Sequence, residues 1–169
     1  NITQVGGATQ SSTNPLFVRP SISVVRVPCN TLTRPANTTT YASYGAVANS
    51  TSAGVLRTFS SAVSANGGSG EIVRAVLRTS AASIPASLRL FLRASASLPS
   101  GVNDGAVSSN LSDYQTDAAG WIDFSPTISG ALSEGLLSSG STMPFTCNVG
   151  NNALYGLLVA QRGGLLQGL

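Results

Sequence analysis

The sequence predicts an all-β fold, a β-sandwich or jelly-roll-like single domain, on three observations. Short runs rich in Val, Ile, Leu and Phe recur along the chain and are separated by Gly, Pro, Asn and Ser, which is the spacing of strands and turns. Roughly seven or eight such runs occur, and none alternates with a long helical pattern, which disfavours a doubly wound α/β fold. The 169 residues are 42% apolar, so one domain can bury a continuous core without disulfide or metal staples.

Composition divides the chain into three parts. Residues 1–20 are polar, rich in Gly, Ser and Thr, and interrupted by Pro15 and Pro20, which predicts an extended N-terminal arm. Residues 21–161 hold the apolar runs and form the predicted β-sandwich domain, and residues 162–169 are expected to be a flexible C-terminal tail. The arm is either a frayed terminus or a segment that orders against a neighbouring molecule.

Strands are expected where apolar residues alternate with polar ones or form short continuous runs. In sequence order the expected strands cover residues 22–29, 44–47, 55–59, 71–79, 88–93, 121–124, 142–149 and 153–161. The last of them is apolar on both faces and is expected to be a central, buried strand. Turns are predicted at residues 65–70, ANGGSG, and 149–152, VGNN. One or two helical turns are expected within residues 128–137, weakened by Gly130 and Gly135.

The most interface-like surface consists of arginines and one phenylalanine that share outward faces of the predicted strands. Its members are Arg74, Arg78, Arg89, Phe91 and Arg93. Arginine is the cation best suited to protein interfaces, because its planar guanidinium binds carboxylates bidentately and is weakly hydrated. Alternatively, Phe91 belongs to the core and the neighbouring arginines extend their apolar stems over it.

Charged residues make up only 9% of the chain, and all of the positive charge is arginine, because lysine and histidine are absent. The nine arginines are scattered from Arg19 to Arg162 without a run, so the sequence shows no basic patch of the kind that binds nucleic acid. No apolar stretch is long enough to cross a bilayer. We therefore expect neither a nucleic-acid partner nor a membrane partner.

The two cysteines, Cys29 and Cys147, lie far apart and lack the close spacing of a zinc or redox motif. They form either two buried free thiols or one long-range disulfide. Free thiols are the favoured interpretation, because the N-terminus does not resemble a secretion signal and the cytoplasm keeps thiols reduced. Cys147 has no histidine partner that would make it a nucleophile, so we interpret it as a core residue.

Catalytic chemistry has few residues to draw on. The lack of histidine and lysine removes the commonest general base, Schiff-base chemistry and the P-loop lysine. An acid pair for glycoside hydrolysis would come from Asp113, Asp117 and Asp123, which lie close in sequence, although such clustering is common. The residues Asn103-Asp104-Gly105 fit a calcium loop only weakly and have the pattern of an ordinary turn. We expect no enzyme activity, no catalytic residue, no metal and no cofactor.

One stretch of the chain resembles a known family. The residues FSSAVSANGGSGEIVRAVL are followed by ASLRLFLRASASLPSGVNDGAVSSNLSDYQTDAAGWIDF. This order of a strand, an ANGGSG-type turn, a second strand, an LRLFL-type strand, a loop with Asn-Asp and a closing G-x-I-D-F element is similar to that of small virion proteins of tailed bacteriophages. Those proteins look like capsid cement, or decoration, proteins. The resemblance covers about residues 41–124 and the final apolar strand, and Arg93 stands where an aromatic residue is common.

The resemblance implies a non-enzymatic structural protein of the virion with a jelly-roll-like fold. Such a protein, made in the host cytoplasm, would bind the capsid exterior and cement neighbouring major capsid proteins, as a homotrimer at threefold positions. The alternative is a tail or fibre module, or a carbohydrate-binding β-sandwich, because fold alone does not separate these classes. Sugar sites usually need exposed aromatic residues, of which the chain offers Trp121 and four tyrosines. The third hypothesis is a small hydrolase with an acid pair.

Overall fold

The part of the chain that the computed structural model describes is built of strands and turns, and no helix occurs in it. This part comprises residues 24–35, 41–52, 55–80, 86–97, 104, 119–126 and 132–161, together with the backbone of short strands at 4–5, 8–9, 40 and 164–165. The prediction of an all-β fold is confirmed.

Eight strands within the described residues have three or more residues. In chain order they are β4 (Arg57–Phe59), β5 (Ser69–Ile72), β6 (Val76–Arg78), β7 (Leu88–Arg93), β8 (Gly120–Phe124), β9 (Leu132–Leu137), β10 (Met143–Thr146) and β11 (Leu154–Ala160). Four two-residue strands form two antiparallel pairs, β1 (Gln4–Val5) with β2 (Ala8–Thr9) and β3 (Thr40–Tyr41) with β12 (Gly164–Leu165). The first pair falls in the predicted arm and β12 in the predicted tail, and the rest of those two segments lies outside the described residues.

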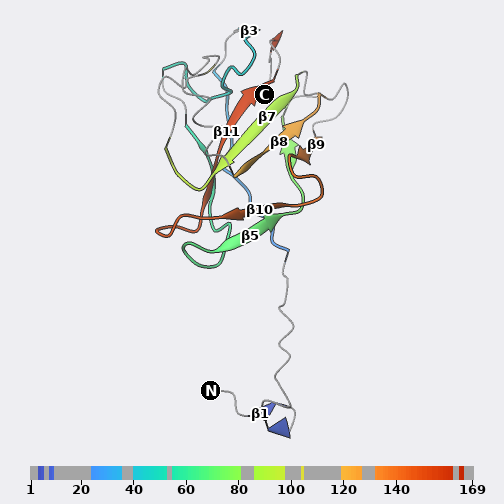
Figure 1. The fold of residues 1–169 in the computed structure, drawn as a ribbon. Coiled ribbons are helices and arrows are strands. Elements are labelled where there is room, and N and C mark those ends of the chain that lie inside the picture. Colours follow the sequence, from blue (N-terminus) through green and yellow to red (C-terminus); the bar gives the residue numbers. More distant parts are fainter. Residues whose placement is uncertain are drawn as a thin grey trace.

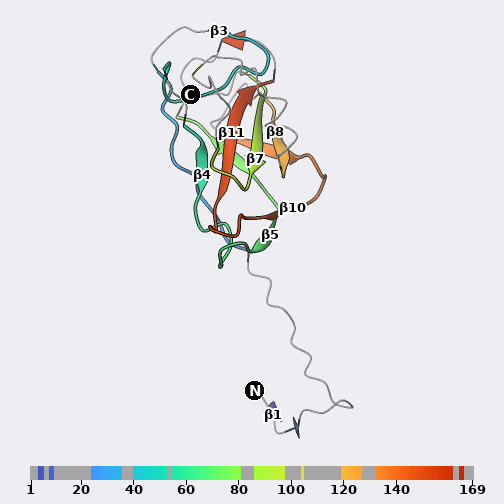
Figure 2. The ribbon, with the colours of Figure 1, turned by 60° about the vertical axis from the view of Figure 1, so that its left-hand side comes forward.

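Six strands form one antiparallel sheet in the order β4-β11-β7-β8-β9-β6, and β10 pairs with β5 in a second, two-stranded sheet. The large sheet is curled, and the two-stranded sheet crosses one end of it (Figure 1). Figure 2 shows β4, β11, β7 and β8 side by side in this order. The strand over residues 88–93 has the predicted bounds, and β11 is an interior strand that is buried along nearly its whole length, as predicted from residues 153–161.

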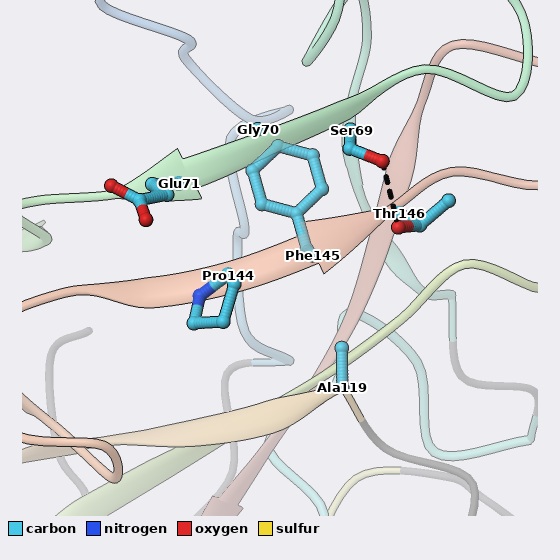
Figure 3. A pocket seen from close by; sticks show the side chains of 7 residues that line it. All are labelled: Ser69, Gly70, Glu71, Ala119, Pro144, Phe145 and Thr146. Atoms are coloured by element: carbon cyan, nitrogen blue, oxygen red, sulfur yellow. Dashed lines mark hydrogen bonds between the residues drawn. The ribbon is translucent and has the colours of Figure 1, made fainter.

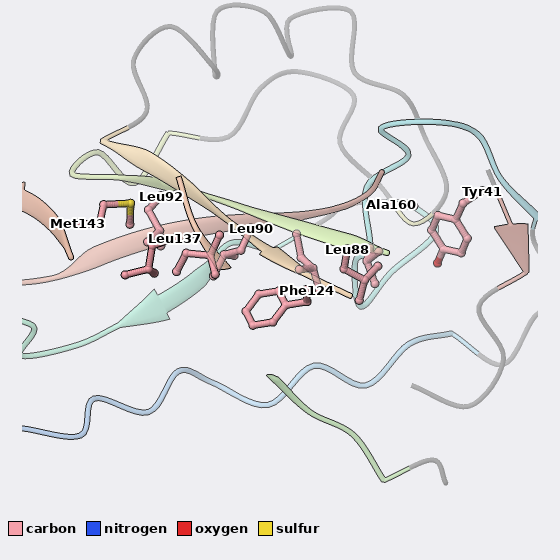
Figure 4. Packing of buried hydrophobic residues seen from close by; sticks show 11 residues of the cluster. Tyr41, Leu88, Leu90, Leu92, Phe124, Leu137, Met143 and Ala160 are labelled. Atoms are coloured by element: carbon pink, nitrogen blue, oxygen red, sulfur yellow. The ribbon is translucent and has the colours of Figure 1, made fainter. Parts of the chain in front are cut away.

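The main core lies on one face of the large sheet (Figure 4). Its buried members are Tyr41, Val47, Leu88, Leu90, Leu92, Ile122, Phe124, Leu137, Met143, Leu158 and Ala160. Each leucine or phenylalanine buried there contributes about 1.5–3 kcal/mol relative to an exposed side chain. Because Met143 comes from β10, the two-stranded sheet packs against the same core as the large sheet.

Residues 132–137 form strand β9, so the prediction of helical turns within residues 128–137 is wrong for this described part. The inward positions of β9 are Ser133, Gly135 and Leu137, only one of which is a large apolar residue, and the alternation was therefore invisible in the sequence. Position 135, between Ser133 and Leu137, requires glycine, because a Cβ there would overlap the side chain of Ile122.

The strand predicted over residues 71–79 is in fact two strands in different sheets. β5 ends at Ile72 and pairs with β10, whereas β6 begins at Val76 and pairs with β9. Ile72 packs on the main core, but Val73 is 50% exposed, so the alternation slips where the chain leaves one sheet for the other. In β6, Leu77 packs on the core and its two neighbours are exposed, so Arg78 faces outward as predicted.

Residues 24–35 form no strand, so the prediction of a strand over residues 22–29 is wrong for its described part. Instead, the segment runs past the edge of β4, where Asn30 Oδ1 accepts a hydrogen bond of 3.0 Å from the backbone N–H of Thr58. Cys29 is exposed, which corrects the expectation that both thiols are buried. Cys147 is buried, both thiols are free, and burial raises the pKa of Cys147.

Candidate protein-binding face

The six-stranded sheet has a second face, opposite to the main core, which we call the outer face. Side chains that lie opposite each other on neighbouring strands point to the same side of a sheet. The paired residues therefore form one row across the outer face, which consists of Val159, Arg89, Asp123 and Leu136. Between β7 and β6 this face carries Arg89, Phe91, Arg93, Trp121, Asp123, Leu132, Glu134, Leu136, Val76 and Arg78.

The sheet brings the five candidate interface residues of the sequence analysis, Arg74, Arg78, Arg89, Phe91 and Arg93, to this one face. Arg74 joins it through its ion pair with Glu134, in which Nε lies 2.8 Å from Oε1. Arg74 and Arg78 are exposed, while Arg89 and Arg93 are half-buried. The five residues that were predicted from sequence to share outward strand faces therefore do lie on one face of the fold.

Phe91 is a correction to the predicted interface. It is 1% exposed and packs in a second buried cluster with Ala46, Leu56, Leu157 and Val159. Leu157 of β11 lies directly beside it in the register. This end of the outer face is apolar and buried, so the alternative in which Phe91 belongs to the core is the correct one.

Arg89 is the centre of the accessible part of the outer face. Its Nε donates to Asp123 Oδ1 at 2.6 Å and its Nη2 to Asp123 Oδ2 at 2.8 Å, so the two groups form a bidentate pair. Gln161 Nε2 also donates to Asp123 Oδ1, at 2.6 Å. The hydrogen bonds with Asp123 raise the pKa of Arg89. The Arg89 and Asp123 side chains are 21% and 28% exposed, so solvent reaches a pair that is held in one geometry.

A partly exposed tryptophan accompanies this pair. The guanidinium carbon of Arg89 lies 4.9 Å from the centroid of the Trp121 ring, which is cation–π distance. Tyr44 is 37% exposed and belongs to a segment that pairs with β11 on the edge away from β7. Tyr44 has a φ of 61°, which is unusual for a bulky residue, and its backbone N–H donates to Ala160 O at 2.6 Å. Tryptophan, tyrosine and arginine are the residue types that carry most binding energy in protein interfaces.

Exposed apolar side chains extend the outer face towards β6. Leu136 is 70% exposed, Leu132 51% and Val76 42%. Glu134, which is ion-paired with Arg74, lies between the two leucines and opposite Val76, so exposed apolar and charged side chains alternate along this part of the face. The two leucines were not predicted as part of this face, because residues 132–137 were expected to be partly helical. Their spacing around Glu134 was the available signal, since a strand would put all three on one side.

The acidic residue Asp104 has a structural role. Its Oδ2 accepts a hydrogen bond from Arg34 Nη2 at 3.2 Å, and its Oδ1 accepts from the Tyr41 hydroxyl and, at 3.0 Å, from the Ala48 N–H. We call Arg34, Tyr41 and Asp104 the buried clasp. The side chains of Arg34 and Asp104 are 4% and 0% exposed, and Tyr41 is 1% exposed. Burial raises the pKa of Tyr41, and the hydrogen bond with Asp104 raises it further.

The remaining acids do not form a two-carboxylate site in the part of the chain that the structure describes. Asp123 is bound by Arg89 and Gln161, and Glu134 by Arg74. The expected acid cluster included Asp113 and Asp117, which lie outside the described residues. Among the described residues there is also no group of three or more side chains suited to hold a metal ion.

Glu71 lines a shallow groove of about 580 Å³ on the two-stranded sheet (Figure 3). The other lining residues are Ser69, Gly70, Ala119, Pro144, Phe145 and Thr146. Ser69 Oγ and Thr146 Oγ1 are hydrogen-bonded to each other at 2.9 Å. A single carboxylate in an open groove does not supply the pair that glycoside hydrolysis requires.

Comparison of the chain with protein-family models, curated proteins and solved structures finds no match. Within the described residues, no helix has the length and apolar character needed to span a membrane.

Proposed function

We propose that this chain is a non-enzymatic structural protein that binds other proteins through the outer face of its six-stranded sheet. The carrying observation is the accessible contact of Arg89 with Trp121, together with the exposed side chain of Leu136 on the neighbouring strand β9. We further propose that its partners are the major capsid protein and other copies of itself, and that it cements the exterior of a tailed-phage capsid. This second part is supported by the resemblance of residues 41–124 to capsid cement proteins.

The geometry of the outer face suits binding rather than chemistry. Asp123 accepts from both Arg89 and Gln161, so Arg89 is fixed before a partner arrives and loses little side-chain entropy on binding. The flanking leucines add apolar area without needing a pocket. Attachment through many such modest contacts fits a protein that covers a repeating shell, where each copy buries an interface of standard size.

Carbohydrate binding, the alternative function, would depend on the same aromatic residues. Arg89 lies over the Trp121 ring, so one face of that ring is already occupied within the chain. A sugar could stack only on the other face of the Trp121 ring. The protein-binding proposal uses Trp121 together with the leucines, and the two proposals can be separated by substituting a leucine.

The test uses capsid particles of the phage that encodes the chain, prepared without it, and measures the Kd of the added protein. Trp121→Ala removes an interface tryptophan, for which we expect a loss of about 2 kcal/mol, roughly 30-fold in Kd. Leu136→Ser removes an apolar side chain from the same face without setting a second carboxylate opposite Asp123, and it should also weaken binding. Leu136 is 70% exposed, so Leu136→Ser should change the melting temperature little. Trp121 is 38% exposed and contacts Arg89, so the melting temperature of Trp121→Ala is measured to confirm that this variant is folded in the assay.

The matched control is Val149→Ser. Val149 is 90% exposed in the turn between β10 and β11, away from the outer face, and its substitution should leave the Kd unchanged. Arg89→Glu is a poor probe, because it would place two carboxylates face to face on neighbouring strands. Wild-type affinity in both Trp121→Ala and Leu136→Ser would contradict the proposal, and a loss in Trp121→Ala alone would favour sugar binding.

A further inference from the structure

Strand β6 forms one edge of the six-stranded sheet. Its neighbour on one side is β9, and no described strand lies on its other side. An edge strand presents backbone N–H and C=O groups that can pair with a strand from another chain. The hydrogen bonds between β6 and β9 determine which of these backbone groups point away from β9.

The Gly135 N–H donates to Ala75 O at 2.9 Å, so these two residues form a hydrogen-bonded pair. Hydrogen-bonded and non-hydrogen-bonded pairs alternate along an antiparallel ladder. Leu77 therefore directs its backbone groups towards Ser133 of β9, whereas Val76 and Arg78 direct theirs away from it. Within the described residues, no backbone group bonds to Val76 or Arg78 on that outward side.

The side chains beside this edge define the kind of partner that fits. Val76 is 42% exposed and lies on the outer face with Leu132, which is 51% exposed. Arg78 lies directly opposite Leu132 and makes no ion pair with any described acid. Arg74 on the same side is paired with Glu134. The edge therefore offers apolar contacts and a positive charge that no acid within the described residues pairs with.

We propose that β6 receives an extended segment of the partner protein as an added strand, and that this segment carries a carboxylate for Arg78 and an apolar side chain for Val76 and Leu132. This inference rests on the proposed protein-binding function and assigns the binding mode of that surface. Main-chain hydrogen bonds would supply affinity, and the flanking side chains would supply specificity.

A second copy of this chain is a poorer occupant of the edge. Antiparallel pairing of β6 with itself, centred on Val76, would set Arg74 directly opposite Arg78 of the other copy. Centred on Leu77, the pairing would bring the two Arg78 side chains into diagonal contact. Like charges at these positions are destabilising, whereas an acidic segment is complementary.

The direct test is amide hydrogen exchange in the full chain, free and bound to capsid particles of the encoding phage that were prepared without it. In the free protein the Val76 and Arg78 amides should exchange rapidly and the Leu77 amide slowly, because only Leu77 is bonded within the ladder. In the bound protein, the exchange of the Val76 and Arg78 amides should slow by at least about 10-fold. Unchanged exchange at both amides in protein that is bound would overturn the inference.

A pair of variants isolates the backbone donor. Val76→Pro removes an N–H that the ladder does not use, and Val76→Thr keeps that N–H and the β-branched shape. We expect at least 10-fold weaker binding for Val76→Pro and wild-type binding for Val76→Thr. If Val76→Pro does not fold, Arg78→Glu replaces it and should also weaken binding at least 10-fold.

The outcomes separate this inference from the proposed function. Failure of the wild-type chain to bind particles overturns both. If the Val76→Pro and Arg78→Glu variants bind with wild-type affinity, strand addition is overturned and the proposed function stands. Loss of self-association in Val76→Pro, measured by light scattering after size-exclusion chromatography, would make a second copy the occupant and overturn the acidic partner.

Discussion

The buried clasp should be one of the most sensitive points of the fold. Asp104→Asn keeps the shape of the side chain but removes the charge that faces Arg34, whose side chain is 4% exposed. Leaving one member of a buried ion pair without its counter-charge costs about 3–5 kcal/mol. The amide also presents an NH₂ group where the carboxylate accepts from the Tyr41 hydroxyl, Ala48 and Arg34, so at least one bond is lost.

Urea unfolding followed by circular dichroism measures this loss as a change in the free energy of unfolding. For a chain of this length, 3–5 kcal/mol corresponds to a fall in Tm of roughly 10 °C. The control is Glu134→Gln, which breaks the ion pair with Arg74 where both side chains are about two-thirds exposed, and which should cost less than about 1 kcal/mol. The double variant Arg34→Met with Asp104→Asn should recover part of the loss, because the buried charge of Arg34 is removed together with that of Asp104. An Asp104→Asn variant as stable as the Glu134→Gln control would refute this reasoning.

Three further predictions concern single side chains. Because burial and the hydrogen bond with Asp104 raise the pKa of Tyr41, the folded state holds this proton more tightly than the unfolded chain. The contribution of protonated Tyr41 to stability is therefore complete below about pH 10 and is lost as the pH rises further. Tyr41→Phe should flatten the alkaline limb of a plot of unfolding free energy against pH. Gly135→Ala should lower the free energy of unfolding by about 1–3 kcal/mol, because the added Cβ overlaps Ile122, and an unchanged urea midpoint would contradict this packing. A thiol reagent such as DTNB should label Cys29 in the folded protein and Cys147 only after unfolding, and rapid labelling of two thiols under native conditions would count against the burial of Cys147.

The sequence predicted the strands whose inward positions are all large and apolar. β7, with three inward leucines, has the bounds that its alternation indicates, and β11 is buried as its apolar run requires. β9 was not predicted, because serine and glycine occupy two of its inward positions. The break between β5 and β6 also left no mark in the sequence, since a change of sheet shifts the alternation by one residue without a proline or a turn motif.

The candidate site was predictable in its residues but not in its geometry. The arginines stood out as outward-facing, yet the pairing of Arg89 with Asp123 depends on a register between strands that are 34 residues apart. The buried clasp joins positions separated by 63 and 70 residues, and the sequence indicated only a turn at Asp104. Local pattern identifies which face a side chain takes, whereas long-range register decides what it meets.

The central claim, that this chain is a structural component of a capsid exterior, is tested most directly by its copy number. Quantitative mass spectrometry of purified particles of the encoding phage would measure the ratio of this chain to the major capsid protein. The proposal predicts a ratio near one to one, as expected for a protein that covers the shell. A handful of copies per particle, or none, would contradict it.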